Sequence, residues 1–204
     1  MRPEVTAAVL RSSRLAPIVV SAVAGLLVVA ALVSARYGLG TVDATTALHV
    51  SMLVTLVGAC YVLDDPAAAS LVAMPVGPLR TTTLRMIVGA VVVGTSWLAQ
   101  LALAPRLVAS SAEWHPLGLV VEPFAILTAV FAAGAWSIGN RPERSVVPVA
   151  LLVLFAYYAV MLFVPDSFVL VASAADQAWD SSRVRWVVLL VAGLVSDWWL
   201  LRRL

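Results

Sequence analysis

Residues 15–35 read LAPIVVSAVAGLLVVAALVSA, an uncharged and almost wholly apolar run that lies between Arg14 and Arg36. A transmembrane helix needs about 20 such residues, because each residue of an α-helix advances ~1.5 Å through a hydrocarbon core ~30 Å thick. The run therefore predicts a membrane-spanning helix over about 16–35, and it places the chain in the class of helical membrane proteins.

Other runs of this kind follow along the chain. Three more uncharged apolar runs predict spans at about 45–63, 86–105 and 146–165. Two further runs contain one acid each, Glu122 at 117–138 and Asp197 at 185–201. Both acids are near an end of their run, where interfacial water lowers the cost of about 2.5–3.5 kcal/mol for a charge at the helix centre. We therefore expect an all-α protein with six transmembrane helices in one domain, 1–204.

The composition of the whole chain also indicates a membrane protein. Of the 204 residues, 62% are hydrophobic and 12% are charged, and the mean hydropathy is +1.01. Soluble domains are about 45–50% apolar and about 25% charged, so a soluble fold of this size could not bury this much apolar surface. Membrane lipid is therefore an expected partner.

Several classes of function lack the residues that they need. The 13 basic residues are all arginine, so no lysine is present for a Walker phosphate loop or a Schiff base. One cysteine, Cys60, and two distant histidines, His49 and His115, give no zinc-binding spacing. The net charge of +2 is too small to indicate a nucleic-acid partner. We expect neither a cofactor nor a metal in this chain.

The distribution of arginines predicts the orientation in the membrane. With the N-terminus in the cytoplasm, the inner arginines are Arg2, Arg11, Arg14, Arg80, Arg85, Arg141, Arg144, Arg202 and Arg203. The outer arginines are then Arg36, Arg106, Arg183 and Arg185. This excess agrees with the positive-inside rule, and an even number of spans places both termini in the cytoplasm. The exclusive use of arginine is typical of a GC-rich bacterial genome, so we expect a multi-pass protein of a bacterial inner membrane.

Two short segments outside the spans each have two interpretations. Residues 3–14 form either an interfacial helix, with Pro3 in its first turn, or a frayed basic tail that only sets the orientation. The apolar segment 168–175, in the outer loop at about 166–184, either lies on the outer interface or enters the protein as a re-entrant piece.

The longest cytoplasmic connection, residues 64–85, reads DDPAAASLVAMPVGPLRTTTLR. Its two aspartates and Pro66 are typical of a helix start, residues 67–74 predict two helical turns, and Pro75 ends them. A short rigid helix below the membrane is a suitable shape for pushing against another protein. The alternative interpretation is an ordinary solvated connection.

This connection resembles the loop between the second and third spans of bacterial ATP-binding-cassette (ABC) exporter permeases of the type-2 family. In that family an acidic residue ends the second span, a coupling helix and a proline-containing turn follow, and a basic residue opens the third span. The matching positions here are Asp64 and Asp65, the helix 67–74, the turn Met74-Pro75-Val76, Arg80 and Arg85. The resemblance extends to the six spans, the N-terminal interfacial helix, the internal termini and the short apolar outer segment.

The resemblance implies a permease half without a nucleotide site of its own. A separate ABC-type ATPase subunit would bind ATP and Mg²⁺ and dock on the coupling helix, and a second permease half, identical or homologous, would complete the pathway. The implied activity is export of a small amphipathic or hydrophobic compound. The residues expected to couple to the ATPase are Asp64, Asp65, Pro66, Leu71, Met74, Pro75, Arg80 and Arg85.

Polar and aromatic residues within the spans are further candidates. The expected lining of the translocation pathway is Met52, Thr55, Tyr157, Tyr158 and Met161, with ordinary helix packing as the alternative. Glu122 is either a substrate or proton site or an acid at the outer interface. We expect Asp197 to anchor the last span, paired with Arg202 or Arg203 beside Trp198 and Trp199. We expect His49 and His115 to be structural.

Two other classes of function remain as alternatives to transport. The chain has no H-E-x-x-H, no G-x-S-x-G and no closely spaced pair of carboxylates in its spans, so a membrane-embedded enzyme is not expected. A non-catalytic membrane scaffold or accessory subunit is the other alternative. A neighbouring reading frame that encodes a Walker ATPase distinguishes the transporter from the scaffold.

Overall fold

The computed structural model describes residues 15–35, 38–64, 78–108, 116–140, 145–163 and 179–203. This part of the chain is helical, apart from turns and one isolated β-bridge between Leu39 and Val108. The α-helices are α2 (Leu15–Ser34), α3 (Thr41–Ala59), α5 (Pro78–Leu103), α6 (Val121–Asn140), α7 (Val147–Phe163) and α8 (Trp179–Leu201). Two short 3₁₀ segments are η1 (Ala104–Arg106) and η2 (Pro116–Leu119). The predicted all-α class is confirmed for the described residues.

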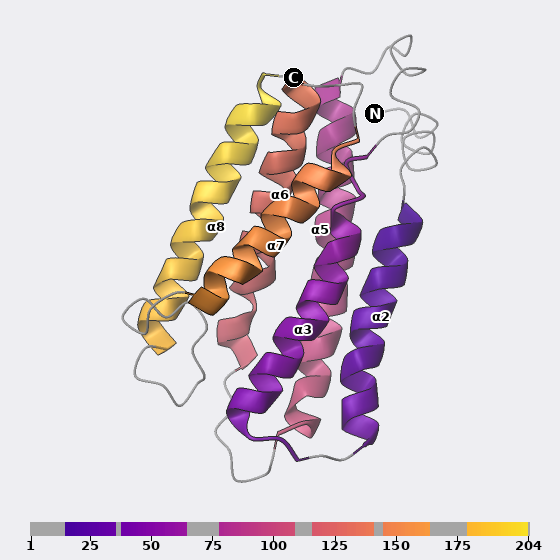
Figure 1. Cartoon of the computed structure of the whole chain (residues 1–204), viewed down its shortest axis with the longest axis vertical. Helices are drawn as coiled ribbons and strands as arrows, with labels where there is room; N and C mark the ends of the chain where they lie inside the picture. Colours follow the sequence, from indigo (N-terminus) through magenta and orange to yellow (C-terminus); the bar gives the residue numbers. More distant parts are fainter. Residues whose placement is uncertain are drawn as a thin grey trace.

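Five of the described helices are long and apolar enough to cross a membrane, namely α2, α3, α5, α6 and α8. The prediction of several helices able to cross a membrane is therefore confirmed for these five. Helix α7 corresponds to the predicted span at 146–165. It has 17 described residues and runs obliquely across the bundle (Figure 1). Its passage through the membrane stays a prediction.

The helices form two groups of three that are consecutive in the chain. Helices α2, α3 and α5 pack mainly on one another and are called the N-terminal group; α6, α7 and α8 are called the C-terminal group, in which α6 packs on both of the others. The start of α2 and the end of α8 lie at the same end of the bundle (Figure 1). Contacts between the groups are fewer and come mainly from α3 and α5 against α6.

Helix α2 has one buried face and one exposed face, and both are apolar. Its buried residues are Ile18, Ala22, Gly25 and Val29, which are three or four positions apart and so share one face. Its opposite face exposes valines and leucines, an apolar surface typical of a contact with lipid or with another protein. The buried stripe contains small residues, which allow the backbones of neighbouring helices to approach closely.

A buried polar network joins the three helices of the N-terminal group. The Gln100 amide of α5 is 0% exposed and accepts a hydrogen bond from the Ser51 hydroxyl of α3 at 2.7 Å. The same amide donates to the Thr55 hydroxyl and to the Ser96 hydroxyl, each at 3.1 Å. Ser96 donates in turn to the Ala22 carbonyl oxygen of α2 at 3.1 Å. These bonds satisfy polar groups that would be costly in an apolar interior.

We expect Gly58→Ala to destabilise the protein by about 1–3 kcal/mol, the usual range for overpacking. A Cβ atom at Gly58 would lie 2.6 Å from the Pro17 carbonyl oxygen and 2.7 Å from the Ile18 Cα, both rigid backbone atoms of α2. The matched control is Gly94→Ala, at another helical glycine, where the added Cβ meets only the ring edge of Phe124, at 3.1 Å. Thermal unfolding in detergent measures the difference, and equal stability of the two variants contradicts this account of the α2–α3 contact.

Two helix boundaries differ from those predicted. Helix α5 begins at Pro78, which suits a first helical turn, so Arg80 and Arg85 lie inside the helix and not before it. Helix α8 begins at Trp179, so residues 179–184, expected in an outer loop, are helical. The predicted coupling helix 67–74 and the predicted segments at 3–14 and 168–175 lie outside the described residues.

Candidate functional site

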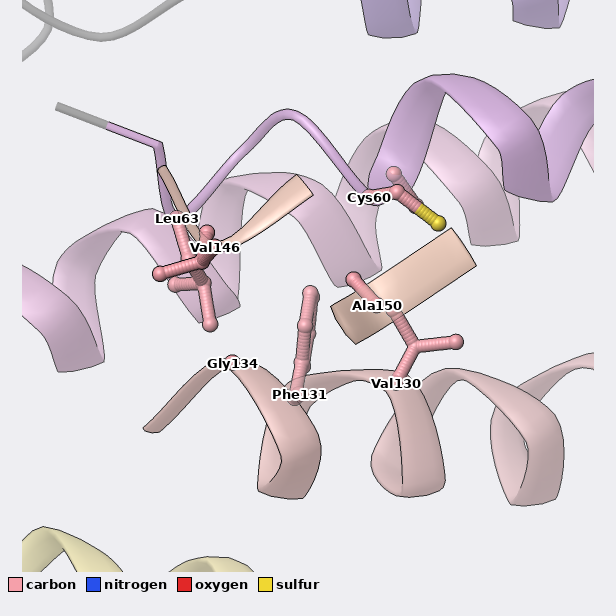
Figure 2. A pocket seen from close by; sticks show the side chains of 8 residues that line it. Cys60, Leu63, Val130, Phe131, Gly134, Val146 and Ala150 are labelled. Carbon is pink, nitrogen blue, oxygen red and sulfur yellow. The ribbon is translucent and has the colours of Figure 1, made fainter. Parts of the chain in front are cut away.

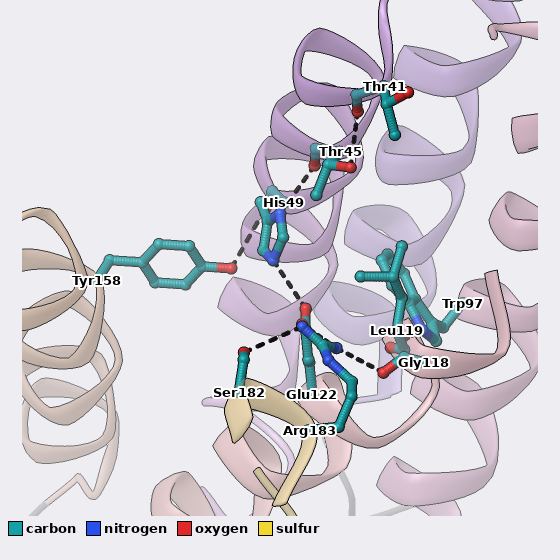
Figure 3. Close-up of polar contacts among 10 residues, drawn as sticks. All are labelled: Thr41, Thr45, His49, Trp97, Gly118, Leu119, Glu122, Tyr158, Ser182 and Arg183. Carbon is teal, nitrogen blue, oxygen red and sulfur yellow. Dashed lines mark hydrogen bonds and ion pairs between the residues drawn. The ribbon is translucent and has the colours of Figure 1, made fainter. Parts of the chain in front are cut away.

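Three ionisable side chains from three helices meet between the two helix groups (Figure 3). His49 comes from α3, Glu122 from α6 and Arg183 from α8. The His49 Nε2 atom lies 2.7 Å from Glu122 Oε2, and an Arg183 guanidinium nitrogen lies 2.5 Å from Glu122 Oε1. We call this set the His–Glu–Arg cluster.

Helix position and nearby residues place Glu122 and Arg183 in the cluster. Glu122 is in the first turn of α6, where the helix dipole favours a negative charge. Pro123 is tolerated in the same turn, because the backbone N–H groups there have no partner within the helix. Arg183 is in the second turn of α8, and its guanidinium lies over the Trp179 ring at 4.2 Å and donates to the Gly118 carbonyl oxygen. A side chain at Gly118 would collide with the Trp179 ring, so glycine permits this approach.

Two members of the cluster are buried in protein, and Arg183 is half-buried. Glu122 is 0% exposed and His49 is 8% exposed. Interpreting Glu122 as an acid in outer interfacial water is therefore wrong for this fold, because neighbouring helices cover the carboxylate. A buried carboxylate is stable only when it is paired and hydrogen-bonded, which His49 and Arg183 achieve together.

Further hydrogen bonds connect the helix groups around the cluster. The Tyr158 hydroxyl of α7 donates to the His49 carbonyl oxygen at 3.2 Å. The Trp97 indole N–H of α5 donates to the Leu119 carbonyl oxygen, in the segment that leads into α6, at 3.1 Å. Tyr157 packs against Trp186 of α8, with ring centroids 5.6 Å apart. Polar contacts between the two groups are thus concentrated around His49 and Glu122.

The residues predicted to line a pathway fall in two places. Met52 and Thr55 are buried inside the N-terminal group, where Thr55 belongs to the Gln100 network. Tyr158 contacts His49 across the two groups, whereas Tyr157 packs against Trp186 within the C-terminal group. The side chain of Met161 lies outside the described residues. Their role in translocation stays a prediction.

The ends of the predicted coupling loop are described and its centre is not. Asp64, just after α3, is 6% exposed, and Arg85, in the second turn of α5, is 5% exposed. Arg80 is exposed on the first turn of α5. The remaining predicted coupling residues lie outside the described residues, namely Asp65, Pro66, Leu71, Met74 and Pro75.

The expected pairing of Asp197 with a nearby arginine is not formed. Arg202 lies over the Trp198 ring at 4.1 Å and Arg203 lies over the Trp199 ring at 3.4 Å. The Oδ1 atom of Asp197 is buried without a hydrogen-bond partner among the described residues. The aromatic rings beside the arginines attract the guanidinium groups through their π faces, so they compete with the carboxylate.

Other features of the described residues do not indicate a binding site. An apolar recess between the end of α3 and helices α6 and α7, lined by residues that include Cys60, Phe131 and Ala150, has no space for a water molecule (Figure 2). No group of three or more metal-ligating side chains occurs in the described ranges. The His–Glu–Arg cluster is therefore the candidate functional site.

Sequence reasoning named both His49 and Glu122 but did not bring them together. They are 73 residues apart, and Arg183 is 61 residues from Glu122 and was expected in an outer loop. The available signal was general: ionisable residues within membrane segments usually face the protein interior and pair with one another. His49 and Glu122 meet that description, because each is an ionisable residue within a predicted span.

No family model matches this chain, and searches of curated proteins and of solved structures likewise find no match.

Proposed function

We propose that this chain is the membrane-spanning permease half of an ABC exporter, driven by ATP hydrolysis in a separate subunit. The observation that supports this most is the attachment of the 65–77 loop at both of its ends. Asp64, which follows the end of α3, and Arg85, in the second turn of α5, are charged and yet buried. Charged side chains are rarely buried without a packing or functional reason, so burial on both sides of the 65–77 connection supports a functional attachment.

Such attachment suits a loop that transmits force. A push on residues 65–77 reaches α3 and α5 together, and both helices pack against α2. The N-terminal group would then move as one body against the C-terminal group, across the boundary where the His–Glu–Arg cluster lies. In the proposed assembly, a second permease half and membrane lipid cover the exposed apolar faces, and both termini lie in the cytoplasm of a bacterial cell.

Co-purification with a partner ATPase tests this function. We expect the chain to co-purify with a Walker ATPase encoded beside its gene, and we expect the purified chain alone to hydrolyse no ATP, because it has no lysine for a phosphate loop. Hydrolysis by the complex should respond to candidate amphipathic compounds. If a preparation free of other subunits hydrolyses ATP, or if the neighbouring ATPase does not bind, the proposal is wrong, and the second result favours a membrane scaffold.

A further inference from the structure

The hydrogen bonds of His49 determine where its ring protons lie. Its Nδ1 atom lies 2.8 Å from the Thr45 carbonyl oxygen. A backbone carbonyl oxygen only accepts hydrogen bonds, so Nδ1 must carry a hydrogen and donate it. The other ring nitrogen, Nε2, faces the Glu122 carboxyl oxygen at 2.7 Å.

This second contact requires one more proton. A neutral ring with its hydrogen on Nδ1 has a lone pair on Nε2, and an ionised carboxylate is an acceptor only. Two acceptors 2.7 Å apart repel, so a proton must lie between Nε2 and Oε2. The proton count is the same for an imidazolium beside a carboxylate and for a neutral ring beside a carboxylic acid.

The charge balance of the cluster favours release of the same proton. Arg183 is always cationic and lies at the other oxygen of Glu122. With the shared proton the cluster has a net charge of +1, and without it the net charge is zero. A buried site disfavours net charge, whereas the His49–Glu122 contact requires the proton. These opposing requirements make the proton exchangeable.

The described parts of the neighbouring helices present phenols and an indole to the cluster. The titratable groups that face the cluster from α7 are Tyr157 and Tyr158, both phenols. Helix α5 contributes Trp97, which does not titrate, beside the Leu119 carbonyl. The cluster charge therefore depends on His49, Glu122 and Arg183 among the described residues.

From this geometry we propose that the His–Glu–Arg cluster is a proton-binding site, with one exchangeable proton held between His49 Nε2 and Glu122 Oε2. On release, the proton passes to water or hydroxide, and the two lone pairs then face each other and repel. The link from α3 to α6 weakens, so protonation controls a contact between the two helix groups. This inference rests on the packing of the described helices and not on the permease assignment.

Nitrogen-15 NMR of the imidazole ring tests the proposal. The chain has two histidines, so His115→Gln leaves His49 as the only source of signal in protein labelled with [¹⁵N]histidine. From about pH 5 to about pH 10, we expect Nδ1 to stay protonated throughout. We expect the Nε2 resonance to shift, as the pH rises, to that of an unprotonated ring nitrogen.

The matched variant adds Glu122→Gln to His115→Gln. A glutamine amide can donate to Nε2 and still accept from Arg183, so it preserves both contacts without an ionisable carboxyl group. We expect the Nε2 titration to be lost, with the ring neutral throughout. If this variant does not fold, the ¹³C carboxyl resonance of Glu122 in the His115→Gln protein replaces it and should shift over the same pH range as Nε2.

Three results overturn the proposal. The first is an Nε2 resonance that does not change over this pH range. The second is a titration that survives unaltered in the glutamine variant, because the proton then belongs to the imidazole alone. The third is a Glu122 carboxyl resonance that does not follow Nε2.

Discussion

Replacement of Glu122 by leucine is expected to destabilise the folded protein by about 3–5 kcal/mol, the range seen when one partner of a buried ion pair is removed. Glu122 is 0% exposed and is the carboxylate that both His49 and Arg183 contact. Without it, the Arg183 guanidinium keeps its charge and retains the Gly118 carbonyl, the Ser182 hydroxyl and the Trp179 ring, none of which carries a compensating negative charge. A loss of this size is a large part of the total stability of a typical protein, about 5–15 kcal/mol.

A double variant tests whether the loss of stability comes from the unpaired charge of Arg183. Glu122→Leu combined with Arg183→Leu removes both charges, and such apolar replacement of a buried pair is often neutral or stabilising. We expect the double variant to be more stable than Glu122→Leu alone. The measurements are the monodisperse fraction after size exclusion in detergent and the unfolding midpoint. A Glu122→Leu protein as stable as the wild type would show that the cluster contributes no net stability.

Substitution of Leu71 and Met74 by aspartate should abolish co-purification of the proposed ATPase. Both residues lie in the predicted coupling helix, outside the described residues, and both would contact the ATPase in the proposed complex. Desolvating an unpaired charge at an interface costs several kcal/mol. Because each ~1.4 kcal/mol changes an equilibrium tenfold, we expect the complex to weaken by about 100-fold or more.

A matched control adds the same two charges elsewhere. Asn140→Asp with Ser145→Asp changes exposed residues that flank the α6–α7 connection, at the same end of the bundle as the end of α3 (Figure 1). We expect this control to retain the ATPase. Both variants should insert into the membrane in equal amounts, because all four positions lie outside the predicted spans or at their ends. If the Leu71→Asp/Met74→Asp protein retains the ATPase and transport-coupled hydrolysis, residues 65–77 are not the coupling element.

Local composition was sufficient to predict the architecture. Runs such as 15–35 identify a membrane-spanning helix without reference to any other part of the chain, because transfer of a helix into lipid depends on the sum of its own side chains. For this reason the helical class and the approximate position of each described helix follow from sequence alone. Helix ends were less accurate: the first two turns of α5 and α8 contain arginines, among them Arg80 and Arg183, which the charge boundaries placed outside the helices.

Tertiary structure alone brought the candidate site together. Whether Glu122 meets interfacial water or a partner depends on which face α6 turns toward α3 and α8, and hydropathy does not report that rotation. The rotation follows from packing, for example from the close contact of Gly58 with α2, which orients α3 and so points His49 toward α6. In the same way, Asp197 has arginines nearby in sequence, but the rings of Trp198 and Trp199 hold their guanidinium groups. Hydropathy is a property of each segment, whereas a polar pair buried between helices is a property of their packing.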